Sequence, residues 1–119
     1  MTELGRHEDA RGVIQDLFTG ALTGVTEIFT RKGAVRGNHV HARTAQWTLV
    51  RSGRLLVVTQ NADFRRRREY GPGEMAEELP GIAHAWKALE DTTVLVFTKG
   101  PRSGADYESD TQRLGVPLL

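Results

Sequence analysis

The sequence contains no cysteine. This absence excludes disulfide bonds, thiolate metal ligands and cysteine nucleophiles, and it is typical of a protein from a reducing compartment. The longest aliphatic runs, at 55–58 and 94–97, are far too short to cross a bilayer. The first residues, 1–12, lack the apolar segment that a signal peptide needs. We therefore expect a cytoplasmic protein with no membrane partner.

The sequence also lacks an excess of charge of either sign. The formal net charge is +1, so no overall field draws the chain to nucleic acid, and we expect no nucleic-acid partner. One basic run, Arg65 to Arg68, is interpreted as part of an exposed edge strand that its charges keep from aggregating; a phosphate contact is the alternative. With 39% hydrophobic and 26% charged residues, the composition is that of a folded domain. We expect one domain over 1–119, with a core at about 24–100 and a C-terminal arm at 101–119.

Glycine, in contrast, is abundant, and the 13 glycines separate short segments rich in Val, Leu, Thr, Phe and Trp. Five of these segments are predicted to be strands: 25–30, 46–51, 55–60, 64–70 and 93–98. No stretch keeps a helical period for three turns, and the best candidate, 74–79, is interrupted at once by Pro80. Short strands with glycine turns between them predict an all-β sandwich or barrel.

The C-terminal segment has two interpretations. It mixes Gly, Pro, Ser and Asp and ends on an apolar stretch at 116–119. It is either a loose tail or an arm that packs its apolar end on the barrel or on a second subunit. Within it, 106–111 is predicted to be a solvated loop; the alternative is that its two aspartates and its tyrosine place polar groups at the mouth of the barrel.

The histidines supply the candidate chemistry. His39 and His41 are two positions apart, so on a strand both side chains point to the same face. Gln46 follows, and His84 comes from a distant segment. Three imidazoles and a side-chain oxygen suit Fe(II), Mn(II), Ni(II), Co(II) or Zn(II). An imidazole with a pKa of ~6.5 also suits proton transfer at neutral pH. A ligand pocket without metal is a further alternative.

The spacing of these histidines and glycines resembles the cupin superfamily. Residues 33–53 match every spacing of its first motif, G(X)5HXH(X)3,4E(X)6G, with Gln46 in place of glutamate. Residues 73–88 match the second motif, G(X)5PXG(X)2H(X)3N, at both glycines and at the histidine, but Leu79 stands for the proline and Ala88 for the asparagine. The resemblance implies a single-domain double-stranded β-helix, which is a jelly-roll barrel.

A narrower resemblance is to small cupins that act on nucleotide-linked sugars. The sequence D-A-R-G at 9–12 and R-G-N-H-V-H at 36–41 are similar to elements of dTDP-4-keto-6-deoxyhexose 3,4-ketoisomerases and, more distantly, dTDP-4-keto-rhamnose 3,5-epimerases. These enzymes move a proton next to a ketone, as a rule without metal. The resemblance implies His39 as the base and His41 as its partner. Arg36 would bind the enolate or the diphosphate.

We therefore expect a small-molecule enzyme, an isomerase or epimerase with a sugar-nucleotide substrate, in which Gln46 and His84 also contact the substrate. Two alternatives remain open. One is a metal-dependent oxygenase or lyase that uses His39, His41, Gln46 and His84 as ligands; the other is a cupin that binds a ligand without catalysis. Because a small barrel exposes the edges of its sheets, we also expect a homodimer.

Overall fold

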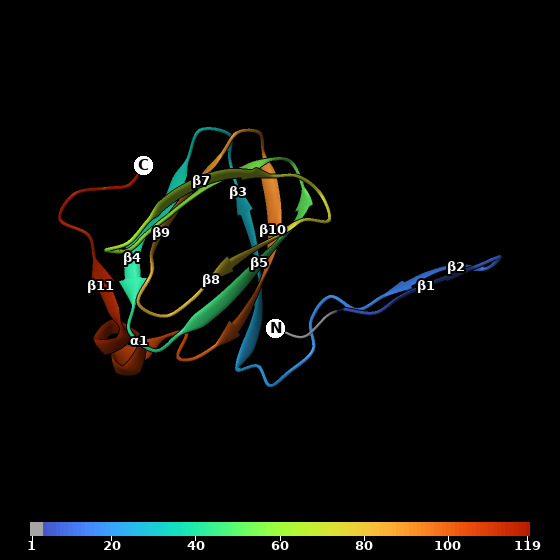
Figure 1. The fold of residues 1–119 in the computed structure, drawn as a ribbon, viewed down its shortest axis with the longest axis horizontal. Helices are drawn as coiled ribbons and strands as arrows, with labels where there is room; N and C mark the ends of the chain where they lie inside the picture. The colour runs from blue at the N-terminus through green and yellow to red at the C-terminus, as the bar shows by residue number, and fades with distance from the viewer. Residues whose placement is uncertain (1–3) are drawn as a thin grey trace.

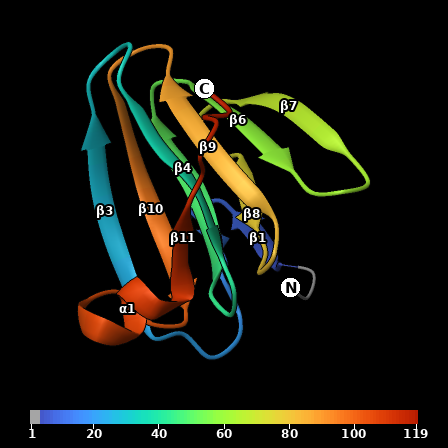
Figure 2. The same cartoon turned by 90° about the vertical axis from the view of Figure 1, so that its left-hand side faces the viewer.

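The computed structural model describes residues 4–119 and consists of two antiparallel sheets that face each other (Figure 1, Figure 2). The four-stranded sheet has the order β3 (Gly24–Thr30), β10 (Thr92–Lys99), β5 (Ala45–Ser52), β8 (Met75–Glu78). The five-stranded sheet has the order β11 (Thr111–Arg113), β4 (Val35–His41), β9 (Ala83–Ala88), β6 (Leu55–Gln60), β7 (Arg65–Tyr70). Among the described residues, no helix has the length and apolar character that a membrane crossing requires.

The architecture confirms the predicted all-β jelly-roll class. Each of the five predicted strands is present, and their ends move by one residue at most. The segment 74–79, which was the best candidate for a helix, contains β8. The basic run lies on β7, which is the edge strand of its sheet as predicted.

The main core lies between the two sheets. Its buried members are Val50, Leu55, Val57, Tyr70, Ala76, Trp86, Val94 and Val96. β5 is buried on both faces, because the segment before β3 covers the outer side of the four-stranded sheet. There the ring of Phe18 lies 4.8 Å from that of Trp47. Burial of such large apolar side chains stabilises the fold by roughly 1.5–3 kcal/mol for each residue.

The C-terminal segment is an arm that packs on the barrel of its own chain. It forms a helix, α1 (Gly104–Asp110), followed by β11, which pairs with β4. Leu118 is buried against Val58 and Ala85 on β6 and β9. The prediction of a solvated loop at 106–111 is therefore wrong: these residues are helical, and the last of them before β11, Asp110, is buried.

A separate hairpin of β1 (Arg6–Asp9) and β2 (Gly12–Gln15) extends away from the two sheets (Figure 1). The D-A-R-G element forms its turn, in which Asp9 accepts hydrogen bonds from the backbone and the guanidinium of Arg11 at 2.9 and 2.7 Å. Every residue of both strands is exposed. This element therefore lies away from the histidines, although the resemblance linked the two elements.

Candidate active site

A bulge in β4 aims both of its histidines into the barrel. The register with β9 shifts between Gly37 and His39, and Asn38 takes a left-handed backbone conformation with φ of 57°. Gly37 has φ of 90°, and a Cβ at this position would lie 2.9 Å from the carbonyl oxygen of His84. Only glycine lets β4 pass this close to β9. The R-G-N-H element therefore places His39 directly opposite His84.

The extra residue of the bulge, Asn38, forms hydrogen bonds with the last residues of the C-terminal arm. The Asn38 side chain accepts a hydrogen bond from the Leu118 backbone at 2.7 Å and donates one to the Leu119 carbonyl at 3.1 Å. Its own carbonyl accepts from Leu114 at 2.9 Å. The arm is thus fixed against β4, beside the histidines.

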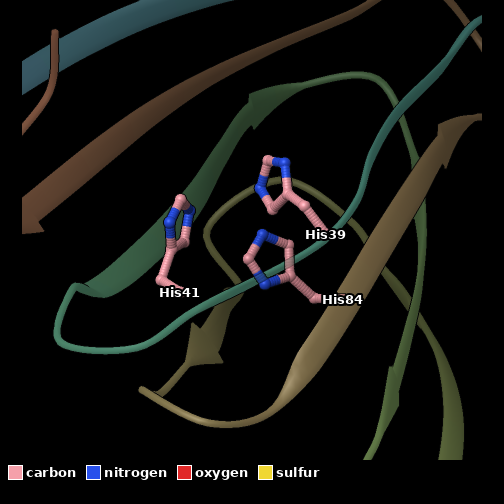
Figure 3. Close-up of side chains that lie close together, drawn as sticks. All are labelled: His39, His41 and His84. Carbon is pink, nitrogen blue, oxygen red and sulfur yellow. The ribbon is translucent and has the colours of Figure 1, made fainter. Parts of the chain in front are cut away.

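The structure brings the three predicted histidines together (Figure 3). His39 and His41 come from β4 and His84 from β9, and their rings point toward one another. The ring centroid of His39 lies 4.6 Å from that of His41 and 4.6 Å from that of His84. One nitrogen from each ring lies within 4.8 Å of the others.

These rings line a cavity of about 200 Å³. The other two predicted site residues, Arg36 and Gln46, lie on its wall. Arg36 is exposed at the edge, where its Nε donates to Thr30 Oγ1 at 2.9 Å and its Nη2 to the Phe29 carbonyl at 3.2 Å. Gln46 is buried on β5. All five predicted site residues therefore line one cavity.

His41 is oriented by residues that the sequence did not reveal. Its Nδ1 lies 3.1 Å from Thr111 Oγ1 and 3.7 Å from Asp110 Oδ2. Asp110 also accepts hydrogen bonds from Thr44 Oγ1 and from the Arg43 backbone. Burial acts to raise the pKa of Asp110, but the hydrogen bonds from Thr44 and Arg43 outweigh it and leave the pKa below its usual value. A buried carboxylate therefore faces the imidazole at neutral pH.

His84 has a corresponding carboxylate. Its Nε2 lies 3.4 Å from Glu78 Oε2, and Glu78 Oε1 accepts a hydrogen bond from Thr48 Oγ1 at 2.8 Å. Glu78 on β8 is the direct partner of Gln46 on β5. The cavity thus contains a carboxylate next to the position where the cupin motif has one. Sequence reasoning missed it because the pairing of β8 with β5 cannot be read from the motif.

Two further residues of the cavity come from the C-terminal part of the chain. Tyr107 on α1 lies with its ring centroid 5.8 Å from that of His41. Arg102, just before the helix, also lines the cavity. The position of Tyr107 agrees with the alternative interpretation of 106–111, in which this segment brings polar groups to the mouth of the barrel.

Burial and mutual repulsion lower the pKa of two of the imidazoles, His39 and His41. Burial lowers the pKa of His39 from 6.5 to about 4, and the charges of His84 and His41 add to the effect. Burial also lowers the pKa of His41, while Asp110 acts in the opposite direction. At neutral pH the rings can therefore accept protons or bind a cation.

The low pKa of His39 predicts a loss of stability in acid. Between pH 6.5 and about 4 the unfolded chain binds a proton that the folded chain does not, so the free energy of unfolding falls as the pH falls through this range. The expected loss is about 2 to 3 kcal/mol. Urea unfolding at pH 7 and at pH 4.5, in the presence of a chelator, measures it.

A His39→Gln variant is the control, because it has no imidazole to protonate at this position. The difference in unfolding free energy between wild type and variant should shrink in acid. If the difference in unfolding free energy stays constant with pH, the loss of stability in acid does not come from His39.

The donor set also fits a divalent transition metal. His39 Nδ1 and His84 Nδ1 are buried and have no hydrogen-bond partner among the described residues. The other nitrogen of His84 faces a carboxylate, as the ring nitrogens of metal-bound histidines usually do. Three converging imidazoles are good ligands for such ions. The residues present therefore fit a metal ion.

The cupin family model matches residues 14–105. No curated protein matches the chain. Among solved structures, the chain is similar to a dTDP-4-dehydrorhamnose 3,5-epimerase from Sulfolobus tokodaii, with 23% identity, a TM-score of 0.72, and coverage of 91% of this chain and 72% of that one. It is also similar to the sugar 3,4-ketoisomerase QdtA from Thermoanaerobacterium thermosaccharolyticum in complex with TDP, with 16% identity, a TM-score of 0.75, and coverage of 95% and 88%.

A 3,4-ketoisomerase from Helicobacter canadensis is similar to the same extent, with 14% identity, a TM-score of 0.75, and coverage of 93% of this chain and 89% of that one. At these identities the similarity concerns the fold. It agrees with the sequence motifs and with the two facing sheets. The chain belongs to the cupin family.

Proposed function

We propose that this protein is an isomerase or epimerase that acts on a nucleotide-linked keto-sugar. The observation that carries the proposal is the buried His41 on the wall of the cavity, because it is a base with the buried Asp110 carboxylate 3.7 Å from its Nδ1 and with the neutral imidazole of His39 beside it. The similar structures of epimerases and ketoisomerases support the same class of reaction.

His41 is the better candidate for the base. A carboxylate next to an imidazole fixes its tautomer and stabilises the imidazolium that forms when it takes a proton. Asp110 supplies this carboxylate to His41, whereas His39 has no acidic partner among residues 4–119 and a pKa of about 4. We therefore assign proton removal from the carbon next to the ketone to His41.

The neighbouring groups stabilise the charge that develops on the ketone oxygen. A neutral imidazole can donate a hydrogen bond to an enolate, and the lowered pKa of His39 keeps that ring neutral. Tyr107, on the arm, brings a hydroxyl to the same cavity and is a candidate donor for the proton that returns to the sugar. His84, held by Glu78, contacts the substrate.

The cavity is large enough for only one part of the substrate, the sugar. Ligand pockets usually measure roughly 300–1,000 Å³. At about 200 Å³, this cavity suits a sugar, and the nucleotide would lie over its mouth. Arg36 and Arg102 line the cavity, and Arg36 is exposed at its edge, where its planar guanidinium suits a diphosphate.

Deuterium exchange tests the proposal directly. The protein is incubated in D₂O with dTDP-4-keto-6-deoxyglucose, and the proton signals of the sugar are followed by NMR. We expect the signal of a proton next to the ketone to disappear, because an acid–base enzyme exchanges it with solvent. Binding of the sugar nucleotide with no exchange and no product would contradict the proposal and favour a cupin that only binds its ligand.

A metal-dependent cupin enzyme is the second candidate function. The two buried Nδ1 atoms without a partner favour it, and His39, His41 and His84 would hold the ion, with Gln46 beside them. A bound dication would polarise a substrate oxygen. Elemental analysis of the purified protein distinguishes the two: one tightly held transition metal per chain, with activity lost on chelation, would favour this candidate.

We also propose that the chain forms a homodimer through the β1–β2 hairpin. A two-stranded hairpin is at best marginally stable by itself in water. In this one Ile14 is 69% exposed and Val13 50% exposed. A second copy packed on the face of the hairpin that carries Ile14 would bury this side chain. Light scattering should give twice the chain mass of 13.2 kDa.

Ile14→Lys is expected to shift the protein to monomer, because a charge would replace the apolar contact. Val116→Lys is the matched control, since Val116 is 81% exposed and lies on the arm. Dissociation caused equally by both substitutions, or by neither, would contradict a dimer formed through the hairpin.

A further inference from the structure

A second cleft lies where the two sheets are open. β7 is the edge strand of the five-stranded sheet, and β8 is the edge strand of the four-stranded sheet. Residues of both strands line a cleft of about 410 Å³, which is larger than the histidine cavity and shares no lining residue with it. Its volume lies within the usual range for ligand pockets.

Four side chains of one face of the β7 hairpin form a ladder along this cleft. Phe64, Arg66, Arg68 and Tyr70 are spaced by two and all line it. The guanidinium of Arg66 lies 5.3 Å from the ring centroid of Phe64, and that of Arg68 lies 4.5 Å from the ring centroid of Tyr70. Stacking on aromatic rings limits the motion of both cations and leaves their N–H groups directed outward.

The positive charge of this ladder is only partly neutralised. Arg68 forms an ion pair with Glu74 at 3.1 Å. Arg66 forms no ion pair with any carboxylate of residues 4–119. Glu77, on the opposite wall, accepts a hydrogen bond from the indole of Trp47 at 3.0 Å. Within the described part of the chain, the guanidinium of Arg66 is therefore not paired with a carboxylate.

The remaining wall is mainly apolar, with Thr59 and Glu77 as its polar members. Val57 from β6, Met75 from β8, and Leu79 and Ile82 after β8 lie in the cleft, and Leu79 is 37% exposed. Two stacked guanidinium groups above such a surface suit an anion with several acceptor oxygens that is attached to an apolar or planar body. We infer that the cleft between β7 and β8 binds a phosphate-bearing small molecule of this kind. The inference does not depend on the function proposed for the histidine cavity.

Titration with phenyl phosphate tests the inference on the full chain. Binding is measured by calorimetry, and the amide shifts of the protein locate the site. We expect shifts on β7 and β8, and affinity at least about tenfold higher than for inorganic phosphate, which lacks the apolar body. Arg66→Gln should weaken binding by about tenfold, because it removes the unpaired charge.

Arg67→Gln is the matched control. It removes the same charge from the adjacent residue of β7, which does not line the cleft. The affinity of the Arg67→Gln variant for phenyl phosphate should stay within about twofold of that of the wild type. Equal weakening by both substitutions would show a general effect of charge and overturn the inference. Shifts confined to the histidine cavity, or tighter binding of a hexaglutamate peptide than of phenyl phosphate, would overturn it as well.

Discussion

Replacement of His41 by asparagine is expected to lower the rate of deuterium exchange into the keto-sugar by roughly 10²–10⁴-fold, which is the usual contribution of a general base. The side chain of His41 alone combines a position on the cavity wall with a contact to the buried Asp110. An amide keeps the polarity of the position but cannot accept the proton. The exchange rate measured by NMR at pH 7 gives the effect.

His39→Asn serves as the comparison, because its imidazole is assigned to stabilise the enolate. Loss of one hydrogen-bond donor of this type costs about 10²–10³-fold in rate. The two variants should also differ in pH dependence, since only His41→Asn removes the titrating base. A His41→Asn enzyme that keeps most of its activity while His39→Asn has none would reverse the two roles and restore the assignment made from the sequence resemblance.

Asp110→Ala is expected to lower the free energy of unfolding by about 2–4 kcal/mol. The carboxylate is buried and accepts hydrogen bonds from the Thr44 hydroxyl and from both the backbone and the side chain of Arg43. Alanine leaves the buried Thr44 hydroxyl without this acceptor and removes the anion next to His41. Urea unfolding at pH 7 measures the change.

Glu108→Ala on the same helix is the matched control, because Glu108 is exposed and its side chain forms no hydrogen bond or ion pair with residues 4–119. This substitution should change the free energy of unfolding by no more than about 0.5 kcal/mol. Asp110→Asn separates shape from charge: it keeps one acceptor oxygen, so it should recover part of the stability. Equal stability of the Asp110→Ala and Glu108→Ala variants would show that the buried carboxylate contributes nothing to the fold.

Much of the fold could be predicted because its signals are local. Glycines and runs of β-branched residues mark the strands, and the spacing of His39, His41 and His84 matches a motif whose residues meet inside a barrel. β4 was recognised only through its histidines, because Gly37 and the bulge at Asn38 interrupt the alternation that identifies a strand. Glycine at such a bulge weakens the local signal.

The residues that orient the histidines could not be predicted. Asp110 and Tyr107 lie in a segment of Gly, Ser and Asp whose composition favours a loop, and α1 is too short to show a helical period. Its conformation is decided by packing of the arm on β4. Glu78 depends on the pairing of β8 with β5, which are separated in the chain by β6 and β7, and such long-range pairing has no signature in the sequence.

The C-terminal arm also determines when the site can form during folding. The contact of Thr111 with His41 joins residues 70 positions apart in the sequence. The hydrogen bond from the Leu118 backbone to the Asn38 side chain joins residues 80 positions apart. Contacts with such large sequence separation form slowly, because the loop between their partners must be closed first. The orientation of the proton-accepting imidazole should therefore be one of the last events of folding, and recovery of activity after dilution from urea should lag behind recovery of the tryptophan fluorescence of the barrel.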